Sequence, residues 1–190
     1  MRQEKMNMPK IKICGLSRPE DITNINEVKP DYCGFIIDVP KSWRNVSISK
    51  VRELVQNLES QICPVGVFVN KDCGEVAQLL NEGTIQIAQL HGQEDEAYIR
   101  RIQKNTGHQV IKAFSVKTAQ DIENAMKSPA DYILLDQGGG GTIAYILANY
   151  GMSVIDSGVA VLNMHAPWEL ISKVDLYEAY NGYVAFLKEA

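Results

Sequence analysis

The chain has 190 residues, of which 45% are hydrophobic and 22% are charged, and its formal net charge is −4. This length and composition fit one ordinary globular domain with a substantial core. They argue against general binding to nucleic acid or to an acidic membrane surface, because no basic excess offsets phosphate charge.

The four cysteines, at positions 14, 33, 63 and 73, lack the pair spacing of a zinc site and are too few for a disulfide framework. Residues 1–9 are polar and lack the apolar core of a signal peptide. No apolar run approaches the length of a membrane span. These features predict a cytoplasmic protein with reduced thiols, no metal site and no membrane partner.

Short apolar runs alternate along the chain with amphipathic helical patterns. The expected strands are Ile11–Cys14, Tyr32–Ile37, Pro64–Val69, Ile85–Leu90, Gln109–Phe114 and Tyr132–Asp136. The expected helices are Pro19–Val28, Ile48–Leu58, Cys73–Asn81, Glu94–Lys104 and Thr118–Lys127.

This alternation indicates a repeated strand–helix unit and therefore an α/β fold with a parallel sheet. No Gly-rich dinucleotide fingerprint follows the first strand, so a TIM (β/α)8-type barrel is favoured over a doubly wound sheet. A single antiparallel hairpin would contradict this architecture. We expect one barrel domain over residues 1–190.

The regular spacing fails after Asp136, because the remaining 54 residues are too few for a sixth helix and two further units, which need roughly 60 or more. Helical patterns cover His165–Lys173 and Tyr183–Glu189, and a strand is expected within Met152–Val161. The barrel is therefore expected to be incomplete or irregular after the sixth strand. An open strand edge needs a cover, for which we expect a homodimer contact or a terminal helix.

Two residues that can exchange protons end strands of this expected sheet. Cys14 ends the first strand, immediately before Gly15, and Asp136 ends the sixth. In parallel α/β folds this edge is where ligands bind. The alternatives are that Cys14 is a small buried hydrophobic residue and that Asp136 only opens a Gly-rich turn.

Six short motifs in order carry a family resemblance. They are Lys12-Ile13-Cys14-Gly15, Gly34-Phe35, Pro40-Lys41-Ser42 with Arg44, Gly66-Val67-Phe68-Val69-Asn70, Gln89-Leu90-His91-Gly92 and Leu134-Leu135-Asp136. Together they resemble the phosphoribosylanthranilate isomerases, (β/α)8 barrels of tryptophan biosynthesis. The resemblance covers residues 10–142 and leaves 143–190 as a divergent C-terminal part.

The resemblance implies an Amadori rearrangement of N-(5-phosphoribosyl)anthranilate to 1-(2-carboxyphenylamino)-1-deoxyribulose 5-phosphate. It assigns the general base to Cys14 and the general acid to Asp136. The implied partner is this small phosphorylated substrate. No cofactor is implied, since proton transfers and charge stabilisation suffice.

The resemblance also implies substrate-binding residues. Arg44 would hold the anthranilate carboxylate, His91 would position the substrate, and Lys12 would lie beside the thiol and the substrate. Gly139 and Gly140 belong to a loop of four glycines that admits close approach of backbone amides. The alternatives are a solvated arginine, a histidine bonded to backbone, and a flexible hinge.

The resemblance fails after Thr142, where the family's Phe-x-Trp segment and its phosphate-binding glycines have no clear counterpart. In one register, Ser157-Gly158-Val159 forms the phosphate turn after strand 8, so that Gly158 contacts phosphate. In the other, which we prefer, Leu162-Asn163 follows strand 7 and His165–Lys173 is the seventh helix. Either register predicts a weakened phosphate site.

Three functions therefore stay open: an active isomerase, a catalytically impaired relative acting as a binding or assembly protein, and another sugar-phosphate isomerase or epimerase. The pair of Cys14 and Asp136 disfavours the third, which would need other acid–base groups or a metal. The sequence favours the first.

Overall fold

The computed structural model describes residues 10–116, 118–136, 161–162 and 170–171. The chain divides into two compact units, one of Lys10–Ile143 and one of Met1–Pro9 with Ala144–Ala190. The single barrel domain expected over residues 1–190 stays a prediction.

Strands and helices alternate through the described part of the larger unit. In chain order they are β1 (Lys12–Cys14), α1 (Pro19–Val28), β2 (Tyr32–Ile37), β3 (Asn45–Val46), α2 (Ile48–Val55), β4 (Cys63–Phe68), α3 (Cys73–Asn81), β5 (Ile87–Leu90), α4 (Glu96–Thr106), β6 (Gln109–Ser115), α5 (Ala119–Ala125) and β7 (Tyr132–Asp136). The alternation expected from the sequence is confirmed, and the two-residue strand β3 is the one addition.

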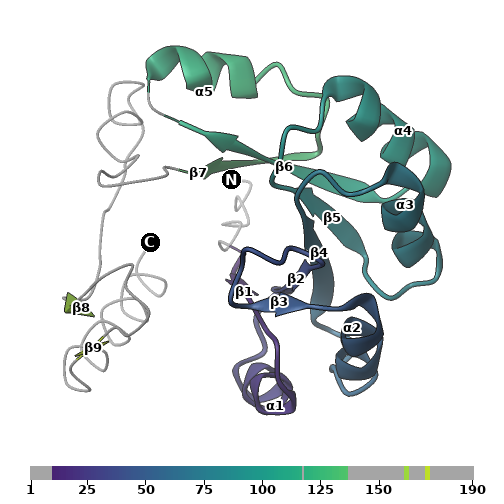
Figure 1. Cartoon of the computed structure of the whole chain (residues 1–190), viewed down its shortest axis with the longest axis vertical. Coiled ribbons are helices and arrows are strands. Elements are labelled where there is room, and N and C mark those ends of the chain that lie inside the picture. Colours follow the sequence, from purple (N-terminus) through teal and green to yellow (C-terminus); the bar gives the residue numbers. More distant parts are fainter. Residues whose placement is uncertain (1–9, 117, 137–160, 163–169, 172–190) are drawn as a thin grey trace, which may run out of the picture. The chain divides into compact units, whose positions relative to one another are not determined.

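All neighbouring strands of this unit pair in parallel, in the order β1-β2-β4-β5-β6-β7, with β3 added beside β2. The sheet curls, and the helices lie along its outer side (Figure 1). Among the described strands, β1 pairs only with β2 and β7 only with β6. The described residues therefore form the arc of a barrel, in which β1 and β7 are the end strands.

The sheet has two faces, and the face toward the helices carries the hydrophobic core. Phe35, Phe68 and Leu90 are fully buried there together with helix residues such as Leu80 and Ile102. The register places Lys12 beside Tyr32 and Cys14 beside Gly34 on the opposite, inner face. Alternation along each strand therefore separates the packing residues from those that line the interior.

Capping residues explain where the helices differ from the expected ranges. The side chain of Asp95 accepts from Tyr98 N, so α4 begins at Glu96 rather than at Glu94. Thr118 forms a capping box with Asp121, so α5 begins one residue later than expected. None of the helices in the described part is long and apolar enough to cross a membrane.

Two short strands lie in the smaller unit. β8 (Val161–Leu162) and β9 (Leu170–Ile171) pair antiparallel, with Val161 opposite Ile171. The helix expected over His165–Lys173 is therefore wrong at Leu170–Ile171, where cross-strand pairing of β-branched and apolar side chains favours a strand. The antiparallel pair contradicts a regular barrel in this part, whereas the six repeated units remain parallel. The helix expected over Tyr183–Glu189 lies outside the described residues.

Candidate active site

The thiol of Cys14 lies on the inner face at the end of β1. Its side chain is half-buried, and Lys12 Nζ lies 3.5 Å from Sγ. Across the ladder is Gly34, where a Cβ would lie only 2.6 Å from Sγ. Glycine at this position therefore leaves room for the thiol, which is not sealed into the core.

The carboxylate of Asp136 lies at the end of β7, on the same face of the sheet as Cys14. Its Oδ2 lies 3.1 Å from Nε2 of His91, which follows β5. The side chains of His91 and Asp136 are 36% and 52% exposed. Parallel strands thus bring three of the expected site residues to the carboxyl edge of one sheet.

A buried amide connects the two sides of this site. Gln89 on β5 accepts a hydrogen bond from Lys12 Nζ through Oε1, and its Nε2 lies 3.2 Å from Nδ1 of His91. The side chains from Cys14 through Lys12, Gln89 and His91 to Asp136 therefore form one continuous polar chain. The ring of His91 bonds to side chains, so the alternative of a histidine ring bonded to backbone is wrong.

Gln89 belongs to one of the six motifs, but the motif alone does not predict it as a site residue. The signal was present in the sequence, because strict alternation along Ile87–Leu90 places this polar side chain on the inner face. Its burial, at 3% exposure, shows that it must find polar partners inside the molecule.

Arg44 is exposed, yet it lies at the same edge. Its Nη1 is 3.3 Å from the carbonyl oxygen of Cys14, and its guanidinium lies 4.4 Å from the ring centroid of Trp43. Gly15, with φ of +88°, lies under this side chain, and a Cβ there would be 2.5 Å from Arg44 Cδ. The exposed guanidinium thus lies beside the backbone of Cys14, where it can bind an anion.

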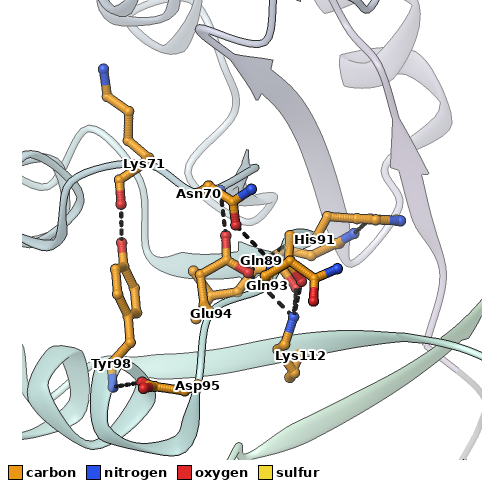
Figure 2. Close-up of polar contacts among 11 residues, drawn as sticks. Asn70, Lys71, Gln89, His91, Gln93, Glu94, Asp95, Tyr98 and Lys112 are labelled. Atoms are coloured by element: carbon orange, nitrogen blue, oxygen red, sulfur yellow. Dashed lines mark hydrogen bonds and ion pairs between the residues drawn. The ribbon is translucent and has the colours of Figure 1, made fainter.

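A buried ion pair anchors the loop that carries His91. Glu94 and Lys112 have side chains only 2% and 7% exposed and lie 3.2 Å apart. Glu94 also accepts from the backbone amides of Asn70 and Gly92, and Lys112 donates to the carbonyl oxygen of Gly92 at 2.7 Å. Figure 2 shows that these contacts join the segments after β4 and β5 to β6.

The remaining expected site residues, Gly139, Gly140 and Gly158, lie outside the described residues. Within the residues that the structure describes, no cluster of three or more His, Cys, Asp or Glu side chains could hold a metal ion.

A family model described as N-(5'phosphoribosyl)anthranilate (PRA) isomerase matches residues 11–144. The chain belongs to the PRA isomerase family. A curated PRA isomerase of Endomicrobium trichonymphae is 40% identical over 129 residues, which cover 68% of this chain and 62% of that relative. The chain thus spans about three fifths of the relative's length.

Solved structures of the family share the fold. A PRA isomerase in complex with reduced 1-(o-carboxyphenylamino)-1-deoxyribulose 5-phosphate is 30% identical with a TM-score of 0.65, covering 76% of this chain and 71% of that one. Monomers generated from the dimeric enzyme of Thermotoga maritima are 32% identical with a TM-score of 0.59, covering 68% and 65%. The expected TIM-barrel type, incomplete in the described part, is confirmed.

Part of this PRA isomerase family member resembles a different protein. A probable M18 family aminopeptidase 1 of Clostridium acetobutylicum is 77% identical over 53 residues, which cover 28% of this chain and 11% of that protein. The PRA isomerase model leaves 46 residues after position 144 and ten before position 11.

Replacing Glu94 by Gln should lower the free energy of unfolding by about 3–5 kcal/mol, because it leaves the buried Lys112 ammonium without its counter-ion. The matched control is Glu82→Gln, which removes the exposed pair with Arg52 and should change the free energy of unfolding little. Urea unfolding of both variants measures the difference. Equal losses would show that the buried pair does not anchor the loop.

Iodoacetamide should modify Cys14 before the other three cysteines at about pH 8, because the thiolate is the reacting form. Burial raises the pKa of the Cys33 thiol to about 12 and also raises the pKa values of Cys63 and Cys73. Mass spectrometry of peptides from the folded protein gives the order. Earlier labelling of Cys33 would contradict the described burial.

Proposed function

We propose that this chain catalyses the isomerisation of N-(5-phosphoribosyl)anthranilate to 1-(2-carboxyphenylamino)-1-deoxyribulose 5-phosphate in the cytoplasm. The observation that carries the proposal is the polar chain from Cys14 to Asp136 on the inner face of the sheet. This polar chain ends in a thiol and a carboxylic acid, which supports acid–base catalysis with the acid acting on the ring oxygen and the base on the C2′ proton.

The first step of the proposed mechanism opens the sugar. Asp136, in its protonated form, gives its proton to the ring oxygen while the bond between C1′ and that oxygen breaks. The anthranilate nitrogen supplies the electron pair, so that a protonated imine forms at C1′. The half-exposed carboxyl group can reach a substrate lying against the inner face.

The second step moves a proton from carbon to sulfur. The thiolate of Cys14 takes the proton at C2′, the C–H electron pair forms the C1′–C2′ double bond, and the π pair of the protonated imine returns to nitrogen. The resulting enolamine tautomerises to the ketone. The ammonium of Lys12, 3.5 Å from Sγ, has the charge that complements a thiolate.

Substrate binding is assigned to residues around these two groups. Arg44 is suited to the anthranilate carboxylate, because its planar guanidinium can make two parallel hydrogen bonds beside Cys14. His91 and Lys12 are proposed to contact the sugar. Gly139, Gly140 and Gly158 remain proposed contacts from outside the described residues.

A second candidate is a catalytically impaired relative that serves as a binding or assembly protein. The match to the aminopeptidase favours it, because the PRA isomerase model ends at residue 144. We infer that most of the 53 matched residues follow that position, since a segment cannot easily be 77% identical to one family and retain another family's motifs. Loss of the family's phosphate contacts would remove binding energy that positions the reacting carbons.

Cys14→Ser and Asp136→Asn should each lower kcat/KM by about 10²- to 10⁴-fold, because each removes one proton-transfer group. A coupled fluorescence assay with freshly prepared substrate measures the turnover. Glu82→Gln, a surface change, serves as the control that retains activity. Turnover that survives both substitutions unchanged would contradict the proposed function.

Complementation of growth and phosphate binding by the unmodified chain distinguish the two candidate functions. Restoration of tryptophan prototrophy in a strain lacking the isomerase supports the enzyme. Failure to restore growth, together with no heat of phosphate binding by calorimetry, supports the impaired relative.

We further propose that a second copy of the chain covers the outer edges of the end strands β1 and β7. Within the described residues each of these strands has one strand partner, and the backbone groups on its other side need partners. Light scattering should then report a dimer, and hydrogen exchange should find slow amides along both edges. A monomer whose edge amides exchange rapidly would argue against the dimer.

A further inference from the structure

The orientation of the buried amide of Gln89 follows from its two neighbours. Lys12 approaches Oε1, and an ammonium group can only donate hydrogen bonds. The oxygen of the amide must therefore face Lys12. The amide nitrogen consequently faces Nδ1 of His91, at 3.2 Å (Figure 2).

The same rule about donors and acceptors assigns the proton on the imidazole of His91. An amide nitrogen only donates, so Nδ1 must accept and carry no proton. The neutral ring then holds its proton on Nε2, which lies 3.1 Å from Oδ2 of Asp136 and donates to it. We propose that Gln89 is a positioning residue that fixes this tautomer of His91, making His91 a hydrogen-bond donor to Asp136.

The charge of Lys12 keeps the amide from reversing. If the amide turned over, its NH₂ group would face the ammonium, and both groups are donors. A proton on Nδ1 would likewise place the ring N–H against the amide N–H. Burial of Gln89, at 3% exposure, makes either arrangement costly because no water can intervene easily.

The fixed tautomer divides the roles within the site. With Nε2 protonated, His91 cannot take the substrate's C2′ proton at that nitrogen, and Nδ1 is occupied by the amide of Gln89. Cys14 therefore remains the proton acceptor of the polar chain. This division of roles rests on the proposed isomerase function, whereas the tautomer follows from the hydrogen bonds alone.

Nitrogen NMR of the full chain labelled with ¹⁵N-histidine tests the tautomer directly. The signals of His91 are assigned by their loss in His91→Asn. At a pH where the ring is neutral, the wild-type protein should show a protonated Nε2 and an unprotonated Nδ1. A wild-type ring protonated on Nδ1, or one exchanging evenly between both tautomers, would overturn the proposal.

The variant Gln89→Glu replaces the donating NH₂ group by an accepting oxygen of the same size. We expect Nδ1 of His91 to gain a proton, which the nitrogen shifts report without reference to activity. The matched control is Gln86→Glu, which makes the same charge change at an exposed position near the start of β5. Unchanged shifts in folded Gln89→Glu would overturn the proposal, and the wild-type spectrum decides it if this variant does not fold.

Turnover tests the positioning role separately. In the isomerase assay, Gln89→Glu should lower kcat by about 10²-fold with a smaller change in KM, since misorientation at the reacting groups costs about that factor. Full kcat in a variant with the switched tautomer would refute the positioning role. A wild-type chain without turnover would refute the proposed function, whereas the NMR result would still decide the tautomer.

Discussion

Parallel pairing of neighbouring strands is the constraint from which the site follows. Because β1, β5 and β7 run in the same direction, the residues at or just after their ends meet at one edge of the sheet. Each of Cys14, His91 and Asp136 lies at least 45 residues from the other two in sequence, yet all three share this edge. Alternation along each strand then decides which side chains face the interior and which face the helices.

The two faces of the sheet carry different polar networks. On the inner face, a chain of polar contacts from Lys12 through Gln89 and His91 reaches Asp136. On the helix-facing side, the ion pair of Glu94 and Lys112 fixes the loop after β5 through backbone amides and carbonyls. The second network supports the first, because it holds the loop that follows β5 and carries His91.

The end strands of the described arc and the two resemblances of the chain both bear on how the proposed site is completed. The arc formed by β1 to β7 exposes apolar residues such as Tyr132 and Leu134, each more than a third exposed, which a closed barrel would cover. The family match stops at residue 144, and 53 residues of the chain are 77% identical to part of a probable aminopeptidase. The proposed catalysis therefore depends on what completes the arc as much as on the proposed acid and base.

The sequence by itself determined the repeated units, their parallel arrangement and the family. Local periodicity is sufficient for this, because a strand that alternates and a helix with an apolar stripe can each be recognised within about ten residues. The expected bounds of β2, α1, α3 and β7 agree with the structure. Cys14, Asp136, Arg44 and His91 were placed at the correct edge because each lies at or shortly after a strand end.

Only the tertiary structure decided the contacts between units. The role of Gln89 as a bridge and the pairing of Lys112 with Glu94 depend on register across the sheet, which no local pattern encodes. For the same reason the helix predicted at Leu170–Ile171 is wrong. These residues fit a helical pattern, but they pair with another strand. Local sequence specifies the elements, whereas the hydrogen bonds between side chains far apart in sequence exist only after the strands have come together.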